Sequence, residues 1–87
     1  MEIYKSKNFQ KNVETCKERN YQMDKLKVVI STLANGMVLD RKYQDHKLHG
    51  KQSDYRECHI EPDWLLVYRI ANGVLYLAST GTHSDLY

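Results

Sequence analysis

Hydrophobic residues recur at helical spacing through the first third of the chain. Phe9, Val13 and Cys16 follow one another at steps of four and three residues, which places them on one face of a helix. Ser6 precedes them as an N-cap. The same spacing continues at Met23, Leu26, Ile30, Leu33 and Met37. Asn35-Gly36 is a typical helix stop. The pattern predicts two antiparallel helices, joined by a short turn, whose apolar stripes face the core.

The second half of the chain has the pattern of strands. Residues 55–60 alternate, with Arg56, Cys58 and Ile60 on one face of the strand. Residues 64–70 are apolar on both faces, which indicates a central strand, and residues 74–80 form a third strand after an Asn-Gly hairpin signal. A short strand at residues 2–4 completes a β-α-α-β-β-β order. We therefore expect an α+β fold with two N-terminal antiparallel helices on one face of a mostly antiparallel four-stranded sheet.

Periodicity is lost between residues 37 and 53, a segment rich in Asp, Lys and His. Leu39, Tyr43 and Leu48 are its expected anchors in the core, and Gly50 marks a backbone position that requires positive φ or a close approach. This predicts a long ordered loop. Such loops in small domains often carry function.

Length and composition limit the class of protein. The 87 residues suffice for a single domain, 1–87, and 41% hydrophobic with 28% charged residues is typical of a soluble globular chain. No apolar run approaches the roughly 20 residues of a membrane span, and the first residues lack a signal-peptide core. Cys16 and Cys58 have no metal-like spacing, so we expect buried thiols, with one disulfide as the alternative. We expect a cytoplasmic protein.

The formal net charge of +2 is unevenly distributed. Residues 1–35 carry seven Lys or Arg against four Asp or Glu, a balance of +3, and residues 36–87 carry six against seven, a balance of −1. The helical half therefore offers lysines to a polyanion, with Lys11, Lys17 and Lys25 as the candidates for a docking face. The alternative is an ordinary solvated helix face.

The stretch Tyr55–Trp64 combines several chemically useful side chains. Pro62 suits the second position of a β-turn, which fixes His59 and Asp63 on opposite arms of one hairpin. Arg56 and Trp64 lie beside them. An imidazole, a carboxylate, a guanidinium and a large ring are the parts needed to hold a phosphodiester and move protons on it. The alternative from these residues alone is a solvated hairpin tip.

Three blocks of the sequence match a known family. They are Tyr43–Gly50, Tyr55–Trp64 and Thr80–Tyr87. In their order and spacing the chain resembles the YafQ branch of the RelE/ParE toxin superfamily. The resemblance implies a RelE-like sheet flanked by two helices, and a groove on the sheet face opposite them. It also implies a ribosome-dependent endoribonuclease, or mRNA interferase, that cuts mRNA in the ribosomal A site and is silenced by a cognate antitoxin protein.

The same resemblance implies site residues. The matching positions are His46, His59, Asp63, Trp64, His83 and Tyr87. Many members end in Phe where this chain has Tyr87, which keeps a stacking ring. His49 has no counterpart that we can assign. We add Arg56, Lys47 and Lys51 as substrate-binding candidates.

These residue types suit metal-independent RNA cleavage by attack of the 2′-hydroxyl on the adjacent phosphate. The reaction needs a base, an acid and positive charge, and histidine serves either proton role. We assign His83 as the general acid and either His46 or Asp63 as the base. His59 then steers, and Arg56 holds the phosphoryl charge.

Two alternatives stand beside this assignment. Zinc is the rival chemistry, because His46, His49, Cys58, His59 and His83 are all ligand types. Cys58 and His59 point to opposite sheet faces, however, and no C-x-x-C or H-x-x-x-H pair exists, so we expect no metal or other cofactor. The second alternative is a non-catalytic ParE-like toxin or binding module of the same fold that acts on another target.

Overall fold

Both long helices have the ends that their sequences predict. In the computed structural model, which describes all 87 residues, α1 spans Lys7–Glu18 and α2 spans Met23–Ala34. The Ser6 hydroxyl accepts a hydrogen bond from the Phe9 backbone N–H at 2.9 Å, which confirms the N-cap. At the end of α2, Gly36 has φ +73°. The Gly36 and Met37 N–H groups donate back to the Leu33 and Thr32 carbonyls, which is a Schellman motif.

The sheet has five strands, one more than expected. Its order is β1-β5-β4-β3-β2, in which β1 (Glu2–Lys5) runs parallel to β5 (Val74–Gly81) and the other pairs are antiparallel. The central strands are β4 (Trp64–Ala71) and β3 (Arg56–Glu61). The additional strand, β2, is only His46–Lys47, and it pairs with β3. Two residues are too few to show a period of two, so the sequence pattern gave no sign of it.

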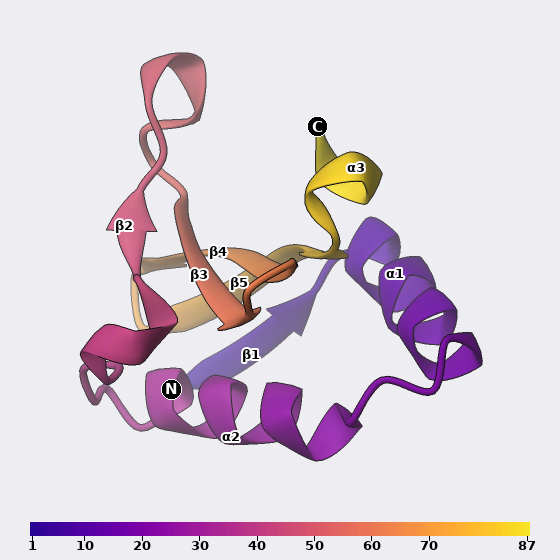
Figure 1. Cartoon of the computed structure of the whole chain (residues 1–87). Coiled ribbons are helices and arrows are strands. Elements are labelled where there is room, and N and C mark those ends of the chain that lie inside the picture. Colours follow the sequence, from indigo (N-terminus) through magenta and orange to yellow (C-terminus); the bar gives the residue numbers. More distant parts are fainter.

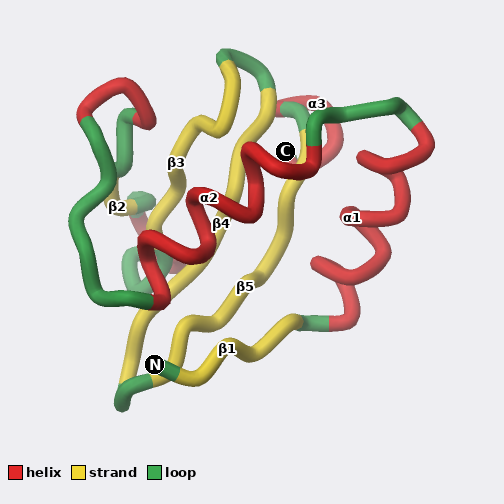
Figure 2. The backbone as a smooth tube through the Cα atoms, turned by 90° about the horizontal axis from the view of Figure 1, so that it is seen from below, coloured by secondary structure: helices red, strands yellow, loops and turns green.

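The helices cover one face of the sheet, as predicted (Figure 1). Their stripes join one core cluster with the sheet side chains Cys58, Ile60, Trp64, Leu66, Tyr68, Leu75 and Leu77. The exception is Met37, which lies beyond the end of α2 and is exposed, because the helix stops before it. The helices are splayed rather than closely paired: α1 packs on β5, and α2 lies across the sheet and contacts β3 (Figure 2). Each stripe is buried by the sheet itself, so the helices need little contact with each other.

The loop between α2 and β3 is ordered, as expected. It contains two 3₁₀ helices, η1 (Arg41–Tyr43) and η2 (Gly50–Gln52), on either side of β2. Leu39 is buried and Tyr43 packs against the core. Gly50 has φ +70°, the positive value that was predicted.

The chain ends in a short helix, α3 (His83–Leu86), rather than a frayed tail. It rises on the sheet face opposite α1 and α2, and so does the connection between β2 and β3 (Figure 1). Leu65 and Val67 point to this second face and are buried there. The described structure contains no helix that combines the length and apolar character needed to cross a bilayer. Both cysteines are buried free thiols.

Candidate active site

Three histidines from three separate elements meet on the sheet face opposite the long helices. His46 comes from β2, His59 from β3 and His83 from the first position of α3. The His59 ring lies between the other two, with its centroid 6.4 Å from that of His46 and 5.8 Å from that of His83. The side chains of His46 and His83 are about half exposed, at 46% and 55%. The cluster is therefore open to a large substrate.

Asp63 holds His83 through two hydrogen bonds. Asp63 Oδ1 accepts one from the His83 backbone N–H at 2.9 Å and lies 2.7 Å from His83 Nδ1. The backbone hydrogen bond, followed by the bond to the ring, lowers the pKa of the Asp63 carboxyl. A carboxylate can only accept, so Nδ1 carries the proton. The Nε2 atom of His83 is then left free to exchange a proton with a substrate.

Glu57 is a site residue that the sequence-based assignment missed. It is only 7% exposed. Its Oε2 lies 3.2 Å from His46 Nε2, and its Oε1 accepts a hydrogen bond from the Tyr87 hydroxyl at 2.8 Å. Strand alternation already placed Glu57 on the His59 face, which was the available signal. Glu57 thus connects the C-terminal residue to His46.

The other nitrogen of His46 is also occupied. Its Nδ1 lies 2.8 Å from the carbonyl oxygen of Gln44, a residue in the left-handed region with φ +49°. A carbonyl oxygen only accepts, so Nδ1 donates. Both ring nitrogens of His46 therefore face oxygen acceptors.

Helix α3 is fixed at its start. Thr82 and Asp85 form a capping box, in which each side chain accepts a hydrogen bond from the other's backbone N–H. Arg19, the C-cap residue of α1, donates two hydrogen bonds to Asp85 at 2.6 and 3.0 Å. A Cβ atom on Gly81 would lie 2.8 Å from Asp85 Oδ2, so glycine leaves room for this carboxylate. These contacts set the position of His83.

Two predicted site residues lie elsewhere. Arg56 points to the helix face of β3, away from His59, and its Nε donates to Asp45 Oδ1 at 3.2 Å. Trp64 is 2% exposed, and its Nε1 donates to the Thr80 hydroxyl at 2.9 Å inside the core. Arg56 therefore does not reach a phosphate at the histidines, and Trp64 offers no exposed ring to a base. From the sequence, Trp64 could be either a core residue or a ring that stacks on a base. Its burial shows that it is a core residue.

The two loop lysines are exposed but do not join the histidines. Lys47 is paired with Arg56 across β2 and β3, so it points to the side away from the His46 ring. Lys51 lies in η2, close to the tip of the loop. They are not part of the cluster.

The three lysines proposed for docking divide into two groups. Lys11 and Lys17 lie on the exposed surface of α1, where Lys17 is 3.8 Å from Glu14. Lys25 lies on α2 and forms an ion pair of 2.6 Å with Glu61. Lys17 and Lys25 thus each have a carboxylate partner, and the shorter Lys25–Glu61 pair offsets its lysine charge more closely, whereas Lys11 has none.

Metal donors do not gather in this site. No three His, Cys, Asp or Glu side chains lie close enough together to hold a metal ion. Cys58 is buried on the helix face, where burial raises the pKa of its thiol to about 12, and a neutral thiol is a poor ligand. The chemistry of the site is that of imidazoles and carboxylates.

Comparison with known proteins shows the family of this chain. A family model described as the bacterial toxin of type II toxin–antitoxin systems, YafQ, matches residues 1–87. The mRNA interferase toxin YafQ of Escherichia coli K12 is 37% identical over 87 residues, which cover 99% of this chain and 95% of the relative.

Solved structures of similar sequence have the same fold. A copper-bound mutant toxin from Helicobacter pylori is 38% identical, with a TM-score of 0.96 and coverage of 100% of this chain and 99% of that one. YafQ in the E. coli DinJ–YafQ complex is 37% identical, with a TM-score of 0.93 and coverage of 99% and 97%. The chain belongs to the YafQ family of bacterial type II toxin–antitoxin toxins.

Proposed function

We propose that this chain is an mRNA interferase that cuts mRNA on the ribosome by metal-independent transphosphorylation. The observation that carries the proposal is the exposed histidine cluster in which Asp63 holds His83 by two hydrogen bonds. A YafQ relative that is 37% identical is named an mRNA interferase toxin, which supports the same activity here.

The reaction fits an acid and a base on either side of one phosphate. The 2′-oxygen of the RNA forms a bond to phosphorus and gives its proton to the base. The bond from phosphorus to the 5′-oxygen breaks, and the acid donates a proton to that leaving oxygen. The products are a 2′,3′-cyclic phosphate and a 5′-hydroxyl. Each well-placed proton transfer contributes about 10²–10⁴ in rate.

The geometry refines the roles of the side chains. His83, with Nδ1 bound to Asp63 and Nε2 free, is the general acid. Asp63 is a positioning residue rather than the base, because its Oδ1 is already occupied by His83. His59 lies between the other rings and makes no hydrogen bond through its own ring, which leaves it free to act as the base. Both ring nitrogens of His46 are engaged by Gln44 and Glu57, so His46 is a positioning residue beside His59.

Partners and location follow from the same proposal. The substrate is mRNA in the A site of a translating ribosome, so the toxin acts in the cytoplasm. Lys11 and Lys17 contact ribosomal RNA, and the exposed ring of Tyr87 stacks on a base. Because E. coli YafQ is solved in a complex with DinJ, we propose that an antitoxin protein also neutralises this chain. A relative is solved with copper; since no three His, Cys, Asp or Glu side chains gather in this chain, we derive no step through a metal.

Cell-free translation with the purified protein tests the proposal. We expect cleavage of translated messages only, with cyclic-phosphate and 5′-hydroxyl ends, and no change when a chelator is added at a magnesium level that keeps ribosomes intact. The variant His83→Ala should lose cleavage at least about 10²-fold. His49→Ala is the matched control, since His49 is exposed and lies outside the cluster. Translation arrest with intact mRNA would contradict the proposal and favour a non-catalytic ParE-like toxin.

A further inference from the structure

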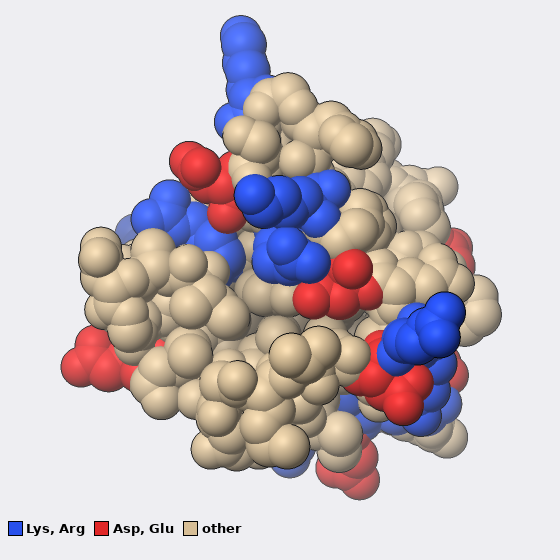
Figure 3. All heavy atoms as spheres, turned by 90° about the vertical axis from the view of Figure 1, so that its left-hand side faces the viewer, with Lys and Arg blue, Asp and Glu red and all other residues tan.

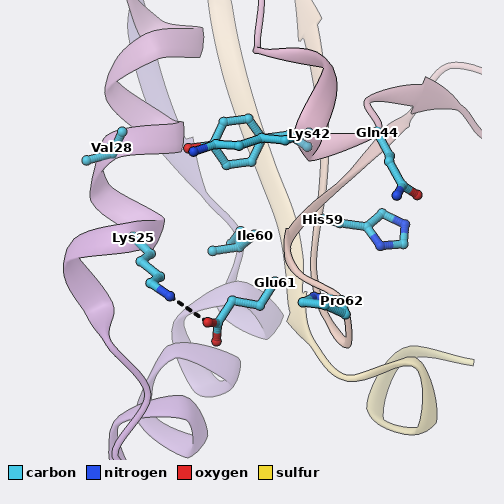
Figure 4. A pocket seen from close by; sticks show the side chains of 9 residues that line it. Lys25, Val28, Lys42, Gln44, His59, Ile60, Glu61 and Pro62 are labelled. Atoms are coloured by element: carbon cyan, nitrogen blue, oxygen red, sulfur yellow. Dashed lines mark hydrogen bonds and ion pairs between the residues drawn. The ribbon is translucent and has the colours of Figure 1, made fainter.

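A groove of about 530 Å³ opens beside the histidine cluster. Helix α2, η1 and the end of β3 form it, and His59 belongs to both the groove and the cluster. Lys25 and Glu61 lie on one side of the groove, and Gln44 and His59 lie on the other (Figure 4). If a phosphate of an RNA strand lies at His59, the neighbouring nucleotide lies in this groove. Its size is within the range of small-ligand pockets.

The two lysines of the groove differ in whether a carboxylate already pairs with them. Lys25 Nζ is 2.6 Å from Glu61 Oε1, so that pair is locally neutral. Lys42 has no carboxylate partner, and its Nζ lies 5.2 Å from the centre of the Tyr43 ring. The surrounding face carries further Lys and Arg side chains around a hollow, with acidic side chains between them (Figure 3). Lys42 is therefore the lysine of the groove that is free to take an anion.

Gln44 connects the groove to the cluster. Its carbonyl oxygen accepts the bond from His46 Nδ1, and its side chain lines the groove next to His59. A side-chain amide offers both a donor and an acceptor, which is what the edge of a nucleobase requires. A molecule bound in the groove would thus contact His59 and lie next to the residue whose carbonyl holds His46.

We propose that this groove is the subsite for the ribonucleotide next to the scissile phosphate, with Lys42 binding its phosphate and Gln44 its base. The inference rests on the proposed function. RNA is the occupant we favour because the groove opens at His59 and places Lys42, which has no carboxylate partner, beside the Gln44 amide. Neither Lys42 nor Gln44 belongs to the histidine cluster, so they serve binding rather than proton transfer.

A binding experiment without the ribosome tests this directly. The probe is a 2′-O-methyl RNA tetranucleotide, which has no free 2′-hydroxyl and stays intact, measured by fluorescence anisotropy over a salt titration. We expect Lys42→Ala to raise the Kd roughly tenfold, as for loss of a hydrogen bond to a charged group, and to reduce the salt slope by about 0.7. Glu61→Gln should lower the Kd, because it frees Lys25. Lys27→Ala is the matched control, since it removes the same charge from α2 outside the groove.

The outcomes separate this inference from the proposed function. If Lys42→Ala and Lys27→Ala have equal effects, or if the wild type does not bind the probe, the subsite is overturned even when mRNA cleavage is intact. If Lys42→Ala instead weakens only the complex with the antitoxin, the groove is a protein contact and the inference also fails. Binding that depends on Lys42 without any mRNA cleavage would support a nucleotide-binding site in the groove and contradict the nuclease.

Discussion

Arg19 and Asp85 lie 66 residues apart in the sequence and are joined by two hydrogen bonds, of 2.6 and 3.0 Å. Asp85 Oδ2 also accepts from the Thr82 backbone N–H at 2.9 Å, which closes the first turn of α3. His83 is the first residue of that turn. The end of α1 therefore holds the helix that presents His83.

The variant Arg19→Ala tests this link. The ion pair is partly exposed, so it contributes little to global stability, and we expect almost no change in Tm. The kcat of mRNA cleavage should fall several-fold because His83 is less well placed, while KM is unchanged. Single-turnover cleavage on ribosomes and a thermal melt measure the two effects.

Arg19→Lys is the matched variant for that experiment. It keeps the charge but loses the fork that binds both carboxylate oxygens, so activity should return only in part. Equal cleavage by wild type and Arg19→Ala would show that the capping box alone positions His83. Thr82 and Asp85 would then suffice.

Asp63→Asn should impair cleavage without unfolding the protein. The amide offers the ring a donor or a weaker acceptor, so His83 loses the fixed Nδ1–H form, and in serine proteases the equivalent change lowers kcat about 10⁴-fold. We expect a loss of 10²–10⁴-fold, read from cleavage rates, with an unchanged circular dichroism spectrum.

The lowered pKa of Asp63 adds a dependence on pH. The hydrogen bonds from His83 favour the ionised carboxylate in the folded state. Their contribution is therefore present above the ordinary Asp pKa of about 3.9 and is lost as pH falls through the lower folded value. Carboxyl NMR shifts over an acid titration follow this directly. A normal Asp63 titration would show that the bond does not persist in solution.

Tyr87→Phe isolates the bond between Tyr87 and Glu57. The ring remains available for stacking, but Glu57 loses one of its two contacts, so we expect kcat to fall a few-fold with KM unchanged. Tm should fall by only a few degrees, because Tyr87 is largely exposed and water replaces much of the hydrogen bond. A rise in KM alone would mean that the hydroxyl contacts substrate instead.

The ionisation of Tyr87 tests the bond between Tyr87 and Glu57 by spectroscopy. Partial burial and the Glu57 carboxylate raise the pKa of Tyr87 from 10.0 to about 12. The folded protein holds this proton more tightly than the unfolded chain. The stabilisation is therefore complete below pH 10 and is lost as pH rises through about 12. The difference between wild type and Tyr87→Phe in tyrosinate absorbance should show one tyrosine that ionises late.

The exposed lysines of α1 test the docking proposal. Lys11→Ala with Lys17→Ala should weaken ribosome binding and reduce its dependence on salt, while the Tm stays within about 2 °C. Lys25→Ala is a useful comparison, since its pairing with Glu61 predicts a smaller effect. Unchanged ribosome sedimentation across a salt series would rule out α1 as the docking surface.

Short-range sequence patterns predicted the helix ends and the faces of the strands. Ser6, Asn35 and Gly36 marked helix ends correctly because capping depends on residues within one turn. Alternation along β3 placed Glu57 and His59 together on one face and Arg56 on the other. That alternation also argued against giving Arg56 a role beside His59, and the structure confirms that the two point apart.

The sequence alone determined the fold class and the side of the sheet on which His59 lies, because helical and strand periods extend over enough residues to be read. The family resemblance came from three matching sequence blocks. The tertiary structure decided that Trp64 is buried, that Glu57 joins His46 to Tyr87, and that Arg19 holds the helix of His83. Those features depend on a two-residue strand, a four-residue helix and contacts between residues far apart in the chain. Such short elements have no period, and only packing brings distant side chains together.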